Sequence, residues 1–166
     1  SEIEPAMMQW SATMYHGEPT RIRPTFDNAA TSMEMRYLGR MAAATKEQRY
    51  IDAFNKGLDY ILAAQYENGG WPQTHPPGDG YERYITFNDG AMARLMFVLD
   101  EIVKKPQQYD FVPEAKRKAA KAAWDKGVGC ILECQVKVDG VPTVWCSQHD
   151  EKDFSPRPAR TFEPVS

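Results

Sequence analysis

The sequence predicts an all-α protein whose helices are joined by long loops rich in glycine and proline. Four segments repeat apolar residues at intervals of three and four, which is the period of a helix that buries one face. Glycine and proline gather between these segments, most densely at 67–85. We therefore expect helices at about 29–44, 47–66, 89–104 and 113–136.

Each expected helix has an apolar stripe that we assign to the core. On the first two helices the stripe consists of Met33, Tyr37, Leu38 and Met41, and of Tyr50, Phe54, Leu58, Ile61 and Leu62. On the last two it consists of Met92, Leu95, Met96, Leu99 and Val103, and of Ala119, Ala123, Val128, Ile131 and Leu132. Proline supports two boundaries, because Pro106 follows the third helix and Pro113 begins the fourth.

The loop at 67–85 is long for a connection without regular structure, and such loops are either functional or disordered. Its aromatic residues, which include Trp71, Tyr81 and Tyr84, favour order. The glycines after Asn68 supply the positive φ angles that let the chain leave the preceding helix. Trp71 either packs against the helices or offers its flat face to a sugar ring, and both interpretations stay open.

A short extended segment is expected after Asp139-Gly140, where Val141, Thr143 and Trp145 alternate with other residues. It leads into a loop at 146–150 and a proline-rich tail, both of which we expect on the surface. The loop histidines His75 and His149 have no serine or cysteine nucleophile at usable spacing, so a structural or substrate-facing role is expected for them.

Length and composition set wide bounds on the function. The chain of 166 residues fits one domain, expected to span 1–166. Its 20 basic and 23 acidic residues include no basic run, so we expect no nucleic-acid partner. No apolar stretch reaches the length of a membrane span, and the N-terminal residues do not resemble a signal peptide. We expect no membrane partner, and any export signal would lie outside this chain.

The most informative feature is a short repeat. Residues 25–30 read Thr-Phe-Asp-Asn-Ala-Ala, and residues 86–91 read Thr-Phe-Asn-Asp-Gly-Ala. Each copy opens a predicted helix and carries an adjacent acid and amide, Asp27-Asn28 or Asn88-Asp89. These residues could simply be N-caps. A repeated half-site is the second interpretation: if the helices are neighbours, their N-termini could present oxygen ligands to one hard cation or polar substrate.

Three cysteines at close spacing argue against a disulfide framework. Together with His149 they have the residue types of a zinc site, namely Cys130, Cys134 and Cys146. The first two lie one turn apart on an expected helix instead of on a zinc knuckle, which counts against this alternative.

Four further motifs, in order along the chain, carry a resemblance to a known family. They are Gln-Tyr-Glu-Asn-Gly-Gly-Trp-Pro-Gln at 65–73, Ile-Thr-Phe-Asn-Asp-Gly-Ala-Met at 85–92, Trp-Cys-Ser-Gln-His-Asp at 145–150 and Pro-Ala-Arg-Thr-Phe-Glu at 158–163. With Phe26-Asp27-Asn28 they resemble the pectate lyases of polysaccharide lyase family 10. The resemblance implies an all-α toroid of paired helices. Relative to that family the chain is short at both ends, so we expect an incomplete toroid.

The same resemblance implies cleavage of polygalacturonate by calcium-assisted β-elimination. It places the catalytic base at Arg160, and it aligns Asp27 and Asp89 with the family's acidic residues at the calcium. Because calcium prefers oxygen ligands, Asn28 or Asn88 is expected as a further ligand. For the substrate we expect Asp27, Asn88, Asp89, Arg83 and Trp71, although Arg83 could instead form an ordinary salt bridge. We expect a secreted or periplasmic monomer.

Two alternatives remain from other classes of protein. The Gln65, Gly70 and Trp71 pattern also resembles the repeats of other helical toroids, such as terpene cyclases and prenyltransferase subunits, but their Asp-Asp-x-x-Asp magnesium cluster is missing here. The short length favours a second alternative, a non-catalytic remnant that binds acidic polysaccharide.

Overall fold

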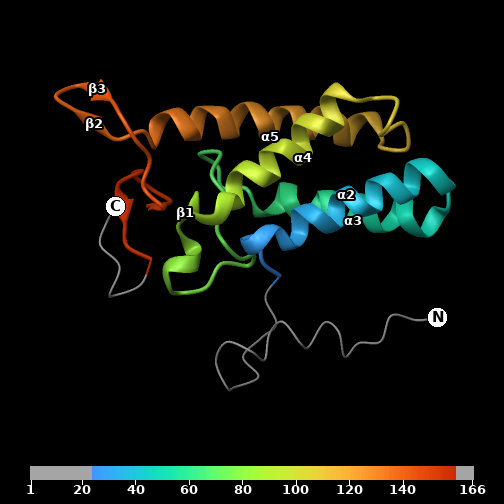
Figure 1. The fold of residues 1–166 in the computed structure, drawn as a ribbon, viewed down its shortest axis with the longest axis horizontal. Helices are drawn as coiled ribbons and strands as arrows, with labels where there is room; N and C mark the ends of the chain where they lie inside the picture. The colour runs from blue at the N-terminus through green and yellow to red at the C-terminus, as the bar shows by residue number, and fades with distance from the viewer. Residues whose placement is uncertain (1–23, 160–166) are drawn as a thin grey trace, which may run out of the picture.

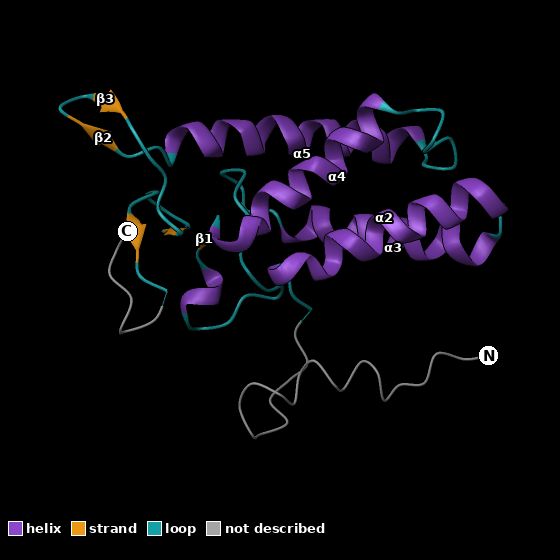
Figure 2. Ribbon diagram, viewed as in Figure 1, coloured by secondary structure: helices purple, strands orange, loops and turns teal. Residues whose placement is uncertain are grey.

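The structure is a computed structural model that describes residues 24–159, and α-helices dominate this part of the chain. The long helices are α2 (Ala30–Thr45), α3 (Gln48–Ala64), α4 (Ala91–Lys104) and α5 (Glu114–Glu133). These four confirm the all-α prediction, and each begins and ends within three residues of the expected boundary. Figure 2 shows how little of the described chain is in strands.

The helices form two hairpins. A two-residue connection makes α3 fold back along α2, and a nine-residue loop returns α5 along α4. The first hairpin contacts the second through α2 on α4 and α3 on α5. Figure 1 shows the pair α2 and α3 lying beside α4, with α5 along the outer edge of the second hairpin. The arrangement of paired helices is the one expected for part of a toroid.

The core lies between the hairpins, and Trp71 of the long loop is inserted into it. Its side chain is fully buried, and its indole Nε1 donates a hydrogen bond of 2.8 Å to the Ile61 carbonyl. The expected stripes of α3 and α4 are largely confirmed, because Phe54, Leu58 and Leu99 are fully buried. Burial of such apolar side chains is the main source of stability in a domain of this kind.

Two of the predicted stripes are wrong in part. Met33 and Tyr37 of α2 are 64% and 54% exposed, and α2 instead buries Ser32, Met35, Gly39 and Ala42. A Cβ at Gly39 would lie 2.8 Å from Cε1 of Tyr109, so only glycine lets that ring pack here. The periodicity argument favoured large residues, whereas α2 buries mainly its small ones against neighbouring side chains.

The same reason applies to α5. Ala119 and Leu132 are exposed, and the buried face consists of Ala120, Ala123, Gly127 and Cys130. A Cβ at Gly127 would collide with the side chain of Met96 and come 3.1 Å from Trp71 Cζ3. Small residues therefore allow α5 to approach α4 and the buried tryptophan closely.

Short strands within the loops pair with one another and so join loop segments that are distant along the chain. β1 (Ile85–Thr86), β4 (Gln148–His149) and β5 (Pro156–Arg157) form an antiparallel sheet in the order β1-β4-β5. Ile85 pairs with His149, which pairs with Pro156. β2 (Lys137–Val138) and β3 (Val141–Pro142) form a separate exposed hairpin, whose turn places Asp139 and Gly140 at positive φ.

One-turn 3-10 helices stand beside these elements. η1 (Asp27–Ala29) leads into α2, η2 (Tyr81–Arg83) lies in the long loop, and η3 (Asn88–Gly90) leads from β1 into α4. Among residues 24–159, none of the helices is both long and apolar enough to cross a membrane.

Candidate active site at the mouths of α2 and α4

The two copies of the repeat adopt the same backbone conformation. Asn28 and Asp89 both have φ of 49°, and the next residues, Ala29 and Gly90, have φ of 63° and 69°. Two successive left-handed residues are uncommon, and asparagine, aspartate and glycine tolerate them best. Alanine at this φ costs roughly 1 to 2 kcal/mol. We call the N-terminal turns that lead into α2 (27–30) and α4 (88–91) the mouths of these helices. Each mouth therefore adopts a specific backbone conformation that costs free energy.

This turn excludes the N-cap interpretation. The N-cap residues of α2 and α4 are Ala29 and Gly90, and neither helix start has a side-chain capping hydrogen bond. The acids and amides of the repeat thus have other contacts.

The shared conformation also corrects the pairing of the two acids. Asn28 is the structural equivalent of Asp89, and Asp27 is the equivalent of Asn88. The aspartates therefore occupy different positions in the two turns, because the order of acid and amide is reversed between the copies.

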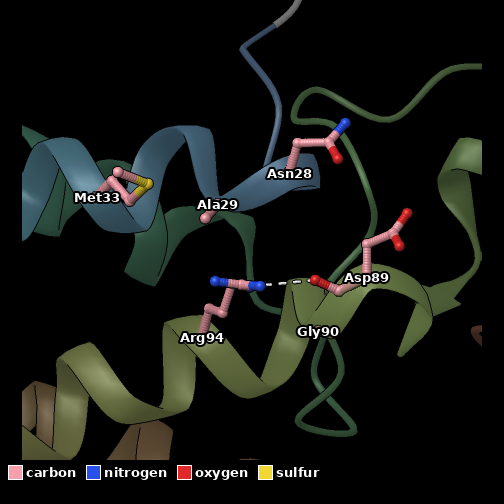
Figure 3. Close-up of a pocket in the computed structure, with 6 residues that line it drawn as sticks. All are labelled: Asn28, Ala29, Met33, Asp89, Gly90 and Arg94. Carbon is pink, nitrogen blue, oxygen red and sulfur yellow. Dashed lines mark hydrogen bonds between the residues drawn. The ribbon is translucent and has the colours of Figure 1, made fainter.

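η1 and η3 lie side by side and enclose a recess of about 430 Å³. Figure 3 shows Asn28 at the mouth of α2, Asp89 at the mouth of α4, and the guanidinium of Arg94 between the two helices. The lining residues are Asn28, Ala29, Met33, Asp89, Gly90 and Arg94.

These six residues are three pairs at the 61-residue offset of the repeat: 28 with 89, 29 with 90 and 33 with 94. In each pair the first copy has a neutral side chain. The second copy supplies an acid in place of Asn28 and a base in place of Met33. The repeat therefore builds one recess from two equivalent half-sites, of which the second carries the charge.

Hydrogen bonds hold the charged half in place. Asp89 Oδ2 accepts a bond of 2.9 Å from Asn88 Nδ2. Arg94 Nε donates a bond of 3.1 Å to the Asp89 carbonyl. Asn28 and Asp89 both line the recess, and within residues 24–159 the Asn28 side-chain amide and Asp89 Oδ1 make no hydrogen bond, so both have ligand capacity to spare.

Asp27 lies beside the recess and does not line it. Its Oδ1 accepts a bond of 2.8 Å from the Asn28 amide, and its Oδ2 accepts one of 2.8 Å from Gln73 Nε2. The Phe26 amide also donates to the Gln73 carbonyl. The carboxylate of Asp27 thus fastens the first mouth to the long loop.

The second mouth is fastened to the C-terminal part of the chain. The Ser147 carbonyl accepts bonds of 2.9 and 3.0 Å from the amides of Phe87 and Asn88. β1, which runs into η3, is paired with β4, and β4 is paired with β5. The segment that precedes Arg160 is therefore part of the sheet that supports Asp89, while Arg160 itself lies outside the described residues.

Comparisons with known proteins identify the family of this chain and related structures. The sequence profile of the pectic acid lyase family matches residues 7–166. This chain belongs to the pectic acid lyase family. The structure is similar to that of a family 10 polysaccharide lyase from Cellvibrio cellulosa, with a TM-score of 0.82 and 38% identity over 87% of this chain and 45% of that one.

A second solved structure is an aspartate-to-alanine mutant of a family 10 polysaccharide lyase from Cellvibrio cellulosa in complex with trigalacturonic acid. It matches with a TM-score of 0.82 and 37% identity over 87% of this chain and 46% of that one. This chain therefore spans less than half the length of these lyases. No curated protein matches it. Membership of the pectic acid lyase family decides against the terpene cyclase and prenyltransferase alternative.

For this pectic acid lyase family member, burial corrects the expected substrate role of Trp71. The ring is inside the core and no ligand can reach it. The packing interpretation accounts for Trp71, because its indole N–H finds a carbonyl partner there.

Arg83 is held away from the recess. Its Nε lies 3.2 Å from Glu151 Oε1, an ion pair that lacks hydrogen-bond geometry. Glu151 is largely buried, with a side chain that is 15% exposed. The salt-bridge alternative therefore describes Arg83, whereas Asn88 lies beside the recess and donates a hydrogen bond to Asp89.

The loop at 146–150 was expected on the surface, and this expectation is wrong. Cys146, Gln148, His149 and Asp150 are buried. His149 Nε2 accepts a bond of 3.0 Å from the Cys146 amide, so Nδ1 carries the proton and donates across 2.7 Å to the Phe154 carbonyl. His149 and Asp150 can be buried here because each has hydrogen-bond partners.

Burial also changes the acidity of this region. It lowers the pKa of His149, and the hydrogen bond to Phe154 opposes the change only partly. Burial raises the pKa of the Cys146 thiol. Asp150 Oδ2 accepts a hydrogen bond of 3.0 Å from Arg157 Nε and forms an ion pair of 2.9 Å with Nη2, and these contacts attach the end of β5 to the loop.

The zinc alternative does not fit this arrangement. Both ring nitrogens of His149 are occupied by hydrogen bonds. Cys130 and Cys134 are buried on α5 with their sulfurs 3.9 Å apart, and their mutual contact and burial raise the pKa of Cys134 far above the usual range. Within the described part of the chain, no three histidine, cysteine or acidic side chains gather as a metal site.

Sequence reasoning missed Arg94 and the buried loop. Arg94 could have been found by extending the repeat four residues beyond Gly90, where an arginine stands in place of Met33. Nothing in the local pattern marks His149 and Asp150 as buried, because the strands on either side of β4, β1 and β5, come from other parts of the chain.

Proposed function

We propose that this chain carries part of the catalytic site of a pectate lyase that cleaves polygalacturonate by calcium-assisted β-elimination. The observation that carries the proposal is the recess in which Asn28, Asp89 and Arg94 meet. Membership of the pectic acid lyase family supports the reaction class. The trigalacturonic acid in a related lyase structure supports the choice of substrate.

The reaction requires a base and stabilisation of negative charge. A base removes the hydrogen on C5 of a galacturonate unit, and the electron pair left behind forms the C4–C5 double bond. The bond from C4 to the glycosidic oxygen breaks, and that oxygen takes a proton. The hydrogen on C5 is only weakly acidic, so charge that develops beside the uronate carboxylate must be stabilised in the transition state.

The donor set of the recess fits calcium, a hard cation that takes six to eight oxygen ligands in flexible geometry. Asp89 and Asn28 would hold it, because both have oxygen atoms to spare and line the same recess. Asp27 would contribute from beside them, while also holding Gln73. Bound calcium would neutralise the uronate carboxylate and so increase the acidity of the neighbouring C–H bond.

Arg160 is the proposed base, on the strength of the Pro158-Ala159-Arg160 motif. An arginine of ordinary, strongly basic pKa loses its proton at neutral pH only at a cost of roughly 7 kcal/mol. The reaction should therefore accelerate as the pH rises through the alkaline range. The pairing of β5 with the sheet that leads into η3 supports a shared site.

We propose that the protein acts as a monomer, outside the cell or in the periplasm. A polymer of galacturonate is too large to enter a cell before cleavage, which favours this location.

The test is to incubate the protein with polygalacturonate and calcium at alkaline pH, and to follow the absorbance of the unsaturated product. Arg160→Ala should lower the rate by about a hundredfold or more, the usual contribution of a positioned base. Asp89→Asn should raise the calcium concentration needed for half-maximal rate.

Two controls match these variants. Asp110 is an exposed carboxylate paired with Lys46, and Arg49 is an exposed arginine paired with Glu47. Asp110→Asn and Arg49→Ala should keep the wild-type rate and calcium requirement.

A non-catalytic remnant that binds polygalacturonate is the second candidate, since this chain spans 45% of the related lyase. Binding of polygalacturonate with no unsaturated product, over the whole alkaline range, would support the remnant and contradict the lyase.

A further inference from the structure

Among residues 24–159, Arg94 is the one cation that lines the recess, and it has no part in the resemblance. It lies on the first turn of α4, faces the mouth of α2 across the recess and is exposed. Its Nε donates to the Asp89 carbonyl, which fixes the position of the guanidinium. Within residues 24–159, the terminal nitrogens of Arg94 have no hydrogen-bond or ion-pair partner. A planar group with free N–H donors is therefore held at the recess.

The two half-sites show that this arrangement is specific to the second copy. Met33 occupies the position equivalent to Arg94, and Ala29 the position equivalent to Gly90. A Cβ at Gly90 would lie 3.3 Å from Arg94 Nε and 3.7 Å from its Cγ. Glycine at 90 thus leaves the space that the arginine side chain uses, and Ala29 in the first copy stands beside an uncharged methionine.

We propose that Arg94 binds a uronate carboxylate of the substrate through its terminal nitrogens and so selects acidic over esterified sugar units. An arginine fork matches the two oxygens of a carboxylate, and charge-assisted hydrogen bonds of this kind are the strong ones. Arg94 contacts Asp89 only through the Asp89 backbone carbonyl. The Asp89 carboxylate therefore remains available to bind a cation. This inference rests on the proposed function and adds to it a residue that determines specificity.

The experiment compares wild type, Arg94→Met and Arg94→Lys, with Arg49→Met as the control. Methionine is the residue of the equivalent position, and Arg49 is exposed and outside the recess. Calorimetry measures the affinity for trigalacturonate and for its fully methyl-esterified form at saturating calcium. The calcium concentration needed for half-maximal trigalacturonate binding is measured as well.

Arg94→Met should weaken trigalacturonate binding by about tenfold, the loss expected for a charge-assisted contact at an exposed site. Arg94→Lys should lose less, because it keeps the charge and loses only the fork. Binding of the methyl ester should not change. The calcium requirement of Arg94→Met should stay the same or fall, because a positive charge beside the cation is removed; Asp89→Asn should raise it. All four proteins should melt at the same temperature, since the altered side chains are exposed.

Equal losses for trigalacturonate and its ester would overturn the inference, and so would full trigalacturonate affinity in Arg94→Met. A raised calcium requirement in Arg94→Met would also overturn it, since the arginine would then be acting through Asp89. In each case a wild-type protein that releases unsaturated product leaves the proposed function standing. A wild type that neither binds nor cleaves polygalacturonate refutes the proposed function, and this inference with it.

Discussion

Single residues in this protein are used in ways that depend on their surroundings more than on their type. Trp71 and Trp145 illustrate this, since the first is buried in the core and the second is 43% exposed, although both indoles donate to a helix carbonyl. Gly90 and Ala29 share a left-handed conformation that only glycine adopts without cost. Two predictions follow from these environments.

Trp71→Phe should destabilise the protein without changing its affinity for trigalacturonate. The variant loses the hydrogen bond to the Ile61 carbonyl, which then has no donor from this side chain, and it leaves a small cavity in the core. Together these changes should cost about 2 kcal/mol. Urea denaturation measures the change in the free energy of unfolding. A lower affinity for trigalacturonate at an unchanged free energy of unfolding would show that Trp71 binds the substrate.

Gly90→Ala should lower the free energy of unfolding by about 1 kcal/mol, because φ at this position is 69°. It should also weaken trigalacturonate binding, since the new methyl group presses on Arg94. Gly129→Ala is the control: its Cβ would meet nothing within 4 Å, and in the middle of α5 it should add about 0.5 to 1 kcal/mol of stability. A higher free energy of unfolding in Gly90→Ala than in wild type would contradict the conclusion that this turn is strained for residues other than glycine.

Among the secondary-structure elements, the short strand β4 connects β1, which leads to Asp89, with β5, which lies just before Arg160 in the sequence. Its residues pair with β1 on one side and with β5 on the other. Neutral His149 links the segments before and after β4, because it accepts a hydrogen bond from the Cys146 amide and donates one to the Phe154 carbonyl. The strand therefore depends on the protonation state of this one buried histidine.

Acidification should destabilise this sheet. The pKa of His149 is lowered in the folded protein by burial, while in the unfolded chain it is close to the ordinary value of about 6.5. Below that pH the unfolded state binds the proton more readily, so stability is lost as the pH falls toward the lower folded pKa. Denaturation at about pH 7.5 and about pH 5.5 should reveal the loss, and His149→Gln should remove it.

Asp153 acts in a different pH window. Its pKa is lowered by hydrogen bonds to Ser155, so any stability it contributes is lost only at pH values below the ordinary range for aspartate. A loss between about pH 7.5 and about pH 5.5 that persists in His149→Gln would therefore contradict the assignment to this histidine.

In the whole molecule, the site exists because two hairpins bring the mouths of α2 and α4 together. Each mouth is fastened to a different part of the chain: the first to Gln73 of the long loop, and the second to Ser147. Neither hairpin contains the recess alone. The equivalence of Asn28 and Asp89 leads to a further prediction.

Exchanging acid and amide between the mouths should preserve part of the function. Asp89→Asn alone removes the carboxylate of the recess, whereas the double variant Asn28→Asp, Asp89→Asn restores one from the other side. Both residue types tolerate the φ of 49° found at the two positions. The double variant should need less calcium for trigalacturonate binding than Asp89→Asn does. A double variant that needs as much calcium as the single one would mean that the half-sites are not interchangeable.

Much of the secondary structure could be predicted from the sequence, and part of the site could too. Apolar spacing located all four long helices, and the buried stripes of α3 and α4 contain large residues that this spacing detects. It misassigned Met33 and Leu132 because α2 and α5 bury glycine and alanine, whose small size is the basis of the close contact. The repeat pointed correctly to the two helix mouths, yet it joined Asp27 to Asp89 where the recess joins Asn28 to Asp89.

The sequence alone determines the local features: the positions of the helices, the residues of the turns and the repeated half-site. Each can be recognised in the chain because it depends on residues only a few positions apart. The recess, the fork of Arg94 beside it and the buried His149 depend on contacts between segments that are distant along the chain. Those contacts follow from how closely small residues let the helices pack and from which loop carbonyls remain to be satisfied. Both are set by the folded arrangement as a whole.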